Sequence, residues 1–422
     1  MSTKKSLKTI NALVFEKKIF KLIKAYLRGL RNPNGYWKPG GPVKLKQVPY
    51  PSLISEDWLV IQTKYCGICG SDMTELKLKG SLDNPLQTFI SFPQIMGHEA
   101  VGVVKQIGSR ITRFKIGERI VISPWFPCAP RGIEPQCVRC MDGDFTHCKN
   151  FKRGHLPQGM HLGVTRGYGG FAPYIAVHES QCFLIPKNVS FEQAVLADPF
   201  SVAFHSILIL NPGPEDTILI YGLGIIGLLA ILCLKSIFHI KNVLAVGRYQ
   251  FQEEMAIKLG AKHVFMNSGE DLINEIASYM NLELYTPEKG LKWSMDGFDG
   301  IIDTIASAET FEIGIRILTT QGRLVFLGVN KPKRFENSLH YFKELEIIGS
   351  NAFSKEFFEG KKTHAFNLFL DFLSNNIIDT APFITHKFPL DQYRKAFNVL
   401  SNKEYFKAIK VLFEFNFESN CE

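Results

Sequence analysis

Three separate stretches of the sequence contain residues that commonly bind metal ions. Residues 65–72 read Tyr-Cys-Gly-Ile-Cys-Gly-Ser-Asp, so a thiol, a hydroxyl and a carboxylate share one glycine-containing turn. His98 and Glu99 follow a glycine further along the chain, and Asp198 precedes a proline. A catalytic zinc ion takes three protein ligands from Cys, His and Asp or Glu and keeps a fourth position open. Cys69, His98 and Asp198 therefore form a candidate catalytic zinc site, with Glu99 as an additional or exchanging ligand.

A second group of cysteines lies outside this set. Cys128, Cys137, Cys140 and Cys148 have the spacing C-x8-C-x2-C-x7-C. Four thiolates form a closed, tetrahedral zinc site of the structural kind. A single ribbon that combined both Cys-x-x-Cys pairs would need a gap of 67 residues between Cys69 and Cys137, whereas compact ribbons use roughly 15–20. We therefore expect two separate zinc sites, one catalytic and one structural.

A glycine-rich turn stands between an apolar strand and an apolar helix. We expect the strand at residues 216–221, the helix from about residue 225, and a second strand at residues 242–246, which is the context that a dinucleotide-binding fingerprint requires. The first glycine allows a tight bend, the second lets the backbone approach a pyrophosphate, and the third lets helix and strand approach closely. The N-terminus of the helix favours the phosphates. The candidate cofactor-binding residues of this turn are Gly222, Gly224, Ile225, Ile226 and Gly227.

The choice between NAD and NADP depends on a position about 20 residues after the last glycine. An NAD-binding chain places an Asp or Glu there, which binds the ribose 2′-hydroxyl. This sequence has Gly247 followed by Arg248 instead. A guanidinium forms bidentate, charge-assisted hydrogen bonds with phosphate, so we expect NADP(H) to be favoured over NAD(H). The alternative is that Arg248 is a solvated loop residue and that NAD binds through other contacts.

The pattern of expected strands and helices divides the chain into two parts. From residue 43 to about residue 190, alternating apolar residues and frequent glycines indicate short antiparallel strands in a barrel-like domain. From residue 216 to residue 329, strands alternate with helices through short loops, which is typical of a doubly wound parallel sheet and of an α/β fold. Residues 10–30 begin like a strand and continue as a basic amphipathic helix. We expect this helix to pack on its own domain rather than on a membrane surface or a partner.

Composition narrows the class of protein further. The chain has 422 residues, of which 45% are hydrophobic and 21% charged, as suits two globular domains. Its net charge of +9 is spread along the chain without a basic stripe, so we expect no nucleic-acid partner. Nine cysteines without a signal-peptide pattern indicate reduced thiols and metal sites. No uninterrupted apolar run reaches the ~18 residues of a membrane span. We therefore expect a cytoplasmic protein with no membrane partner.

The order of these motifs resembles the zinc-dependent medium-chain dehydrogenases, the superfamily of alcohol, polyol and threonine dehydrogenases. The resemblance runs from about residue 43 to the end of the chain. It implies a GroES-like antiparallel β-barrel catalytic domain, formed by residues 1–198 and 346–422. It also implies a Rossmann NAD(P)-binding domain, formed by residues 199–345, and a homodimer or homotetramer.

The resemblance assigns roles to individual residues as well. Ser71 would pass the substrate proton onward, and Asp72 would orient a metal-bound histidine. Relatives often have Glu-Pro where this chain has Asp198 and a proline, and some have a histidine at the position of Thr74. Two further residues, for which we expect only structural roles, are Cys66 and His205.

The cysteine cluster departs from the family pattern. The structural zinc lobe of relatives usually reads C-x2-C-x2-C-x7-C, and Glu134 occupies the first of those positions here. Either Cys128 reaches into the site from an earlier position, or Glu134 is the fourth ligand, or the site is incomplete. We favour Cys128.

The activity implied by the resemblance is hydride transfer between an alcohol, polyol or sugar CH–OH group, or the matching carbonyl, and NAD(P). Zinc would lower the pKa of the alcohol oxygen, and the nicotinamide would exchange the hydride. Two alternatives stay open, namely a zinc-independent NADPH reductase of the same fold and a protein that senses nucleotide or metal without turnover. The presence of all four candidate zinc ligands favours the zinc enzyme.

Overall fold

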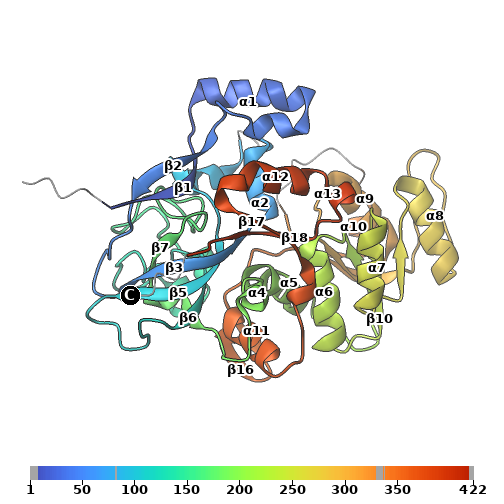
Figure 1. The fold of residues 1–422 in the computed structure, drawn as a ribbon. Coiled ribbons are helices and arrows are strands. Elements are labelled where there is room, and N and C mark those ends of the chain that lie inside the picture. The colour runs from blue at the N-terminus through green and yellow to red at the C-terminus, as the bar shows by residue number, and fades with distance from the viewer. Residues whose placement is uncertain (1–7, 81–82, 329–335, 337, 418–422) are drawn as a thin grey trace, which may run out of the picture. The chain divides into compact units, whose positions relative to one another are not determined.

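The computed structural model describes residues 8–80, 83–328, 336 and 338–417 (Figure 1). The chain divides into two units. Unit 1 consists of Met1–Asp198 and Phe357–Glu422, and unit 2 consists of Pro199–Glu356. Each unit has a hydrophobic core of its own. Among the helices of the described residues, none has both the length and the apolar character needed to cross a membrane.

A mainly antiparallel sheet of seven strands forms the centre of unit 1. The long strand β3 pairs with β5 along one edge, and with β7 and then β18 along the other. Its apolar residues 58–61 are fully buried, which matches the position of a central strand. In sheet order the strands are β17 (Ile384–Pro389), β18 (Lys410–Glu414), β3 (Trp58–Gly67), β5 (Glu99–Ile107), β6 (Arg119–Ile122) and β8 (Cys182–Leu184), with β7 (Tyr174–His178) also on β3.

Helices cover parts of this sheet and its loops. The amphipathic helix α12 buries Tyr393, Ala396 and Phe397 in the core of unit 1. The helices that lie in unit 1 after its N-terminal region are α2 (Gly70–Leu76), α3 (Val138–Met141), α4 (Phe191–Ala194), α11 (Ala365–Ser374), α12 (Tyr393–Ser401) and α13 (Lys403–Phe406). A two-stranded sheet of β15 (Lys355–Phe358) and β16 (Lys361–His364) precedes α11.

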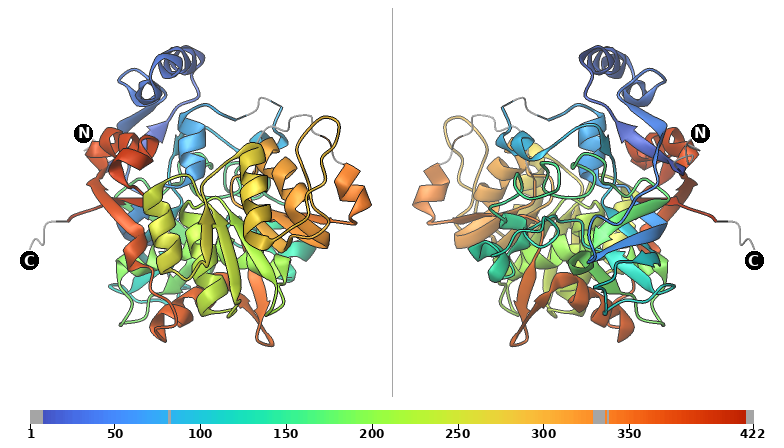
Figure 2. Two further views of the ribbon diagram at one scale, coloured as in Figure 1. Left: turned by 90° about the vertical axis from the view of Figure 1, so that its right-hand side faces the viewer. Right: turned by 90° about the vertical axis from the view of Figure 1, so that its left-hand side faces the viewer.

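The N-terminal region forms a small antiparallel sheet, in which β1 (Thr9–Phe15) lies between β2 (Val43–Pro49) and β4 (Gln94–Ile95). Phe15 at the end of β1 pairs with Val43 at the start of β2, so residues 16–42 form the connection between these two strands. They contain α1 (Ile19–Arg31) and the 3-10 helix η1 (Pro33–Trp37). In Figures 1 and 2, α1 (blue) projects from this hairpin at the edge of its unit.

We expected α1 to pack on its own domain, and the residues that it buries there are small ones rather than most of its apolar stripe. The helix contacts unit 1 through Ala25 and Gly29, its two buried residues. A small-residue face allows close approach, and the ring of Tyr36 lies directly over Gly29. Leu22 is partly buried against the core of unit 1, whereas the other large apolar side chains of α1 are exposed. The helix therefore packs on its domain through the face that carries Ala25 and Gly29, and most of its large apolar side chains face outward.

Unit 2 is built on a six-stranded, fully parallel sheet. Its central strand β9 and the following helix α6 are almost entirely apolar and buried, as expected for elements enclosed on all sides. In sheet order the strands are β11 (His263–Phe265), β10 (Asn242–Val246), β9 (Thr217–Tyr221), β12 (Phe298–Asp303), β13 (Leu318–Phe326) and β14 (Glu346–Gly349). The helices are α5 (Ala197–Leu210), which begins in unit 1, and α6 (Ile225–Ser236), α7 (Gln250–Lys258), α8 (Gly269–Met280), α9 (Ala308–Ile317) and α10 (Ser338–Phe342).

The division into units differs from the expected domain boundary at residues 345 and 346. The segment that begins at Glu346 forms β14, which pairs in parallel with β13 and is the last strand of the six-stranded sheet. Its hydrogen bonds therefore belong to unit 2, and unit 1 resumes at Phe357. At the other boundary the first segment of unit 1 ends at Asp198, the residue after which we expected the change of domain.

Candidate metal centres and nucleotide turn

Cys69 lies in the turn that joins β3 to α2. The strand ends at Gly67, and Cys69 immediately precedes the first residue of the helix. The backbone N–H of Cys69 donates a 2.9 Å hydrogen bond to Oδ2 of Asp72. Asp72 lies in the first turn of α2, so this bond caps the N-terminus of the helix. Asp72 is buried, whereas Ser71 beside it is exposed. The carboxylate of Asp72 thus fixes the backbone that carries the Cys69 thiol.

Glu99 begins the neighbouring strand β5, and His98 directly precedes it. Glu99 is the first residue of β5 and pairs with Gly67. A Cβ at Gly67 would come within 1.9 Å of Glu99 Oε2, so a larger residue there would displace the Glu99 carboxylate. Ligand atoms of Cys69, His98 and Glu99 all lie within 4.8 Å of one another. One thiolate, one imidazole and one carboxylate are a ligand set that catalytic zinc uses, so these residues fit a zinc ion.

Asp198 does not belong to this group of three. It lies in the first turn of α5 and is 8% exposed. Burial raises the pKa of Asp198 to about 7, although His98 nearby opposes the shift. The carboxylate that lies with Cys69 and His98 in the structure is therefore that of Glu99, and Asp198 lies outside the group. An aspartate is one methylene shorter than the glutamate common in relatives, which agrees with a carboxylate that stops short of the group.

Asp72 is the residue that we expected to orient a metal-bound histidine. Its Oδ1 lies 3.9 Å from Nδ1 of His98, which is longer than a direct hydrogen bond. Burial raises the pKa of Asp72, and His98 opposes this shift. Burial likewise disfavours protonated His98, but Cys69 and Asp72 outweigh it and raise its pKa well above the usual value. The two side chains are thus coupled electrostatically across the turn.

Lys410 is a buried cation at this site that the sequence did not reveal. It lies on β18 and is 1% exposed. Its Nζ forms an ion pair with Oε2 of Glu99 and donates a 3.2 Å hydrogen bond to the carbonyl oxygen of Ile68. Burial opposes the ammonium charge, but Glu99 and then Cys69 raise the pKa of Lys410 above its usual value. Lys410 therefore fixes one oxygen of Glu99 in a site where an unpaired charge would be costly.

His161 is a second neighbour that the sequence did not reveal. Its ring centroid lies 5.2 Å from that of His98, and its Nδ1 bonds to the carbonyl oxygen of Leu162. Burial, with a further contribution from His98, lowers the pKa of His161 to about 3. The ring is therefore neutral at pH 7. With Nδ1–H committed to the backbone, its Nε2 is a hydrogen-bond acceptor.

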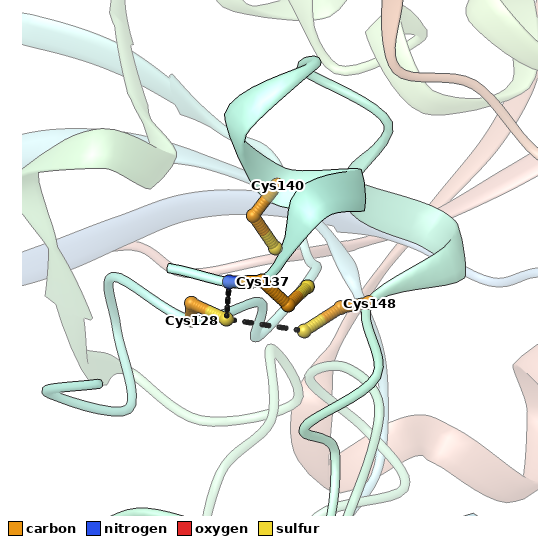
Figure 3. A group of neighbouring side chains, drawn as sticks. All are labelled: Cys128, Cys137, Cys140 and Cys148. Atoms are coloured by element: carbon orange, nitrogen blue, oxygen red, sulfur yellow. Dashed lines mark hydrogen bonds between the residues drawn. The ribbon is translucent and has the colours of Figure 1, made fainter. Parts of the chain in front are cut away.

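The four cysteines of the second group come together in unit 1, as Figure 3 shows. Their sulfur atoms all lie within 4.8 Å of one another, and Cys128 Sγ is 3.7 Å from Cys148 Sγ. In a tetrahedral site with Zn–S bonds of about 2.3 Å, sulfur atoms are about 3.8 Å apart. The group includes Cys128 and does not include Glu134. The four residues therefore fit a structural zinc ion, with Cys128 as the fourth ligand.

Backbone and amide hydrogen bonds support these thiols. The N–H of Cys137 donates to Sγ of Cys128 at 3.3 Å, and the side-chain amide of Asn150 donates to the same sulfur at 3.2 Å. The N–H of Asn150 donates to Cys148 at 3.3 Å. Hydrogen bonds to the charged form stabilise a thiolate. The pKa of Cys148 is lowered to about 6, chiefly by a hydrogen bond from Cys140.

Arg131 holds the loop that carries Cys128. Its side chain is fully buried and lies within the loop between Cys128 and Cys137. Burial lowers its pKa to about 10, so the guanidinium remains charged at pH 7. Its five hydrogen bonds all go to backbone carbonyl oxygens, those of Phe126, Arg153, Leu156, Pro157 and Gly159. This one side chain ties together the two segments that flank the cysteine group.

The glycine turn of unit 2 connects β9 to α6. Gly222 has a φ of +99°, a left-handed conformation that favours glycine. A Cβ at Gly227 would lie 1.9 Å from the carbonyl oxygen of Gly222, whereas a Cβ at Gly224 would meet nothing within 4 Å. The turn thus has a tight bend, a close approach of helix to strand and an open position between them. These are the three features that a pyrophosphate site needs. Ile225 and Ile226 begin the helix.

Arg248 lies at the same edge of the sheet as the glycine turn. Tyr221 at the end of β9 pairs with Val246 at the end of β10, and Gly247 and Arg248 follow directly. The chain passes from β9 outward to β10 and β11 and then returns to β12 on the other side of β9. Nucleotides bind at the carboxyl ends of strands at such a switch point. Arg248 is exposed there, with its guanidinium 5.5 Å from the ring centroid of Tyr249.

Family models match segments of both units of the structure. Residues 55–187 match the family model for the alcohol dehydrogenase GroES-like domain, and residues 226–373 match that for zinc-binding dehydrogenase. Sorbitol dehydrogenase from Bacillus subtilis (strain 168) is 26% identical over 356 residues, which is 84% of this chain and 89% of that protein. The two family matches together span more than half of the chain.

Solved structures show the same fold. A protein from E. coli CFT073, described as a short chain alcohol dehydrogenase (rspB) and solved with NADH, superposes with a TM-score of 0.73 at 23% identity, covering 96% of this chain and 99% of that one. A zinc-binding dehydrogenase from Sinorhizobium meliloti 1021, solved with NADP, gives a TM-score of 0.71 at 22% identity, covering 97% and 100%. The chain belongs to the zinc-dependent medium-chain dehydrogenase/reductase family. The predicted α/β class, with a GroES-like and a Rossmann-type domain, is confirmed.

Proposed function

We propose that this protein is a zinc-dependent dehydrogenase that transfers a hydride between a CH–OH group of an alcohol, polyol or sugar, or the matching carbonyl, and a nicotinamide dinucleotide. The observation that carries the proposal is the convergence of Cys69, His98 and Glu99 within 4.8 Å, on elements separate from the four-cysteine group. The B. subtilis relative is named for a polyol substrate, which supports the substrate class.

The residues of the chain have distinct tasks in this reaction. Bound zinc would act as a Lewis acid on the substrate oxygen, and the nicotinamide would exchange the hydride. Cys69, His98 and Glu99 would bind the metal. Lys410 restrains Glu99 through its ion pair, and Asp72 restrains the Cys69 turn through its hydrogen bond.

Proton transfer is the task that we assign to Ser71. Its side chain is exposed beside Cys69, at the start of α2, so its hydroxyl can exchange a proton with both substrate and water. Thr74, at the position where some relatives have a histidine, donates its hydroxyl to the carbonyl oxygen of Gly70 at 3.0 Å. That hydrogen bond occupies its only O–H. The proton would therefore leave Ser71 through water rather than through Thr74.

The catalytic proposal is tested with the intact, zinc-loaded protein and a panel of polyols, sugars and secondary alcohols. We expect formation of reduced nicotinamide with at least one of them, and loss of that activity to background in Cys69→Ala. The matched control is Cys66→Ala, since Cys66 is buried in the core of unit 1 and should not bind the metal. Activity that persists in Cys69→Ala would favour a zinc-independent reductase, and nucleotide binding without turnover would favour a sensing protein.

We propose NADP(H) as the preferred cofactor, together with one catalytic and one structural zinc ion. The preference is supported by Arg248 and by the absence of an acidic residue at Gly247, in the segment that directly follows β10. Arg248→Ala should raise the KM for NADP by about tenfold or more, since a bidentate charge-assisted contact is lost, while the KM for NAD changes little. Lys258→Ala, an exposed cation at the far end of α7, is the control. Equal effects on both cofactors would refute the assignment.

We also propose that the protein is a homodimer or homotetramer, as its family resemblance implies. Light scattering coupled to size-exclusion chromatography would give the mass of the assembly directly. A monomer at micromolar concentration would contradict this part of the proposal.

A further inference from the structure

The outward face of α1 is apolar along its whole length. Six large side chains on this helix are between 48% and 88% exposed: Ile19, Phe20, Ile23, Tyr26, Leu27 and Leu30. At about 100° per residue they fall within an arc of roughly 120°. The buried Ala25 and Gly29 lie on the opposite side. These six side chains thus form a continuous exposed apolar stripe on α1, and the helix contacts its own unit through the small residues on its opposite face.

The anchoring of α1 fixes the direction of this stripe. Arg28 donates a 2.8 Å hydrogen bond to the carbonyl oxygen of Pro39, and Lys21 forms an ion pair with Glu16 at the end of β1. The ring of Tyr36 would be only 2.2 Å from a Cβ at Gly29, so the close contact of α1 with this ring requires glycine there. These contacts hold α1 with its apolar stripe facing outward.

Every charged residue in α1 and in the two positions before it is positive. Lys24 and Arg31 are exposed and flank it on one side, and Lys17 and Lys18 are exposed just before the helix. From residue 17 to residue 31 the sequence contains no acidic residue. The nearest one, Glu16, is already paired with Lys21 and Lys46. An anionic surface would complement this segment, whereas an antiparallel copy of α1 would place its cations against the same cations.

We propose that α1 docks this protein on the surface of a membrane that contains anionic lipids. The apolar stripe would enter the boundary between headgroups and acyl chains, and the basic side chains would contact lipid phosphates. A helix with a strong apolar face, basic flanks and low overall hydrophobicity lies in the plane of such an interface rather than across it. This assignment revises our expectation of no membrane partner, and it is independent of the catalytic proposal.

Co-sedimentation of the full chain with vesicles tests this docking. We expect binding to phosphatidylcholine vesicles that contain phosphatidylglycerol, weak binding to phosphatidylcholine alone, and release as salt is raised. Lys24→Glu with Arg31→Glu should lower the partition coefficient by at least ~tenfold, because each cation near an anionic surface contributes to binding. Phe20→Ser with Leu27→Ser should lower it by at least ~tenfold on both vesicle types, because apolar burial is lost.

The matched control replaces two exposed apolar residues elsewhere, as Tyr341→Ser with Tyr405→Ser, which are 88% and 84% exposed. This variant should bind vesicles like the wild type. All replaced side chains are exposed, so each variant should keep the unfolding temperature and zinc content of the wild type. Failure to bind phosphatidylglycerol vesicles, or full binding by the Phe20 and Leu27 variant, would overturn the proposal. A fall in assembly mass in that variant, without vesicle binding by the wild type, would identify α1 as a contact between copies instead.

Discussion

Replacement of Arg131 by methionine should destabilise unit 1 severely. The guanidinium is fully buried and donates five hydrogen bonds to backbone carbonyl oxygens, four of them at 2.9–3.3 Å. Each such bond contributes about 0.5–1.5 kcal/mol net, and the carbonyl groups left behind would be buried without a donor. We expect a loss of about 3–5 kcal/mol, which is near the upper end for a single substitution.

Thermal unfolding measures this effect. For a domain of this size, 1 kcal/mol corresponds to about 2–4 °C, so the Arg131→Met transition should fall by roughly 6–20 °C. Arg131→Lys should recover only part of the loss, because an ammonium has three donors and no planar fork. Zinc should also leave the four-cysteine site faster in the presence of a chelator.

The control for Arg131 is Arg153→Met, the same chemical change at an exposed side chain in the neighbouring loop. It should alter stability by less than about 0.5 kcal/mol. If Arg131→Met unfolds at the temperature of the wild type and of this control, the reasoning that one side chain holds the cysteine lobe is wrong.

Three further outcomes follow from the geometry. Hydrogen bonds from Lys21 and then Lys46 lower the pKa of Glu16 to about 2. An unfolded Glu has a higher pKa of ~4.3, so ionised Glu16 stabilises the folded state. This stabilisation is present above about pH 4.5 and is lost as the pH falls towards 2. Glu16→Gln should thus cost about 1–2 kcal/mol at pH 7 in urea unfolding, allowing for the partly exposed lysines, with the difference gone near pH 2. Gly227→Ala should weaken both folding and dinucleotide binding in calorimetry, because its Cβ would clash 1.9 Å from a backbone oxygen, whereas Gly224→Ala should affect binding alone; equal stability losses would contradict this. Elemental analysis should find that Cys128→Ser loses one zinc ion and that Glu134→Gln loses none.

The parts of the site that the sequence predicted are those encoded by local motifs. The turn around Cys69 follows one strand, and His98 and Glu99 stand at the start of another, so antiparallel pairing of the two strands was enough to bring them together. The glycine turn likewise depends on one strand and the helix that follows it. In these cases a few adjacent residues determine both the conformation and the chemistry.

The parts that the sequence did not predict depend on contacts between distant segments. Lys410 reaches Ile68 from 342 residues away, and a lysine in an apolar strand near the end of the chain resembles an ordinary edge residue. Arg131 gave no signal because all its partners are backbone carbonyl groups, which any sequence supplies. The periodicity of α1 predicted an apolar face but not its direction, which Ala25 and Gly29 determine by close contact.

Zinc content per chain, measured by elemental analysis in the wild type, Cys69→Ala and Cys66→Ala, tests the central assignment most directly. The two separate ligand groups predict about two zinc ions in the wild type, one in Cys69→Ala and two in Cys66→Ala. A wild type without zinc, or a Cys69→Ala variant that keeps the full wild-type content, would contradict a catalytic zinc at Cys69, His98 and Glu99.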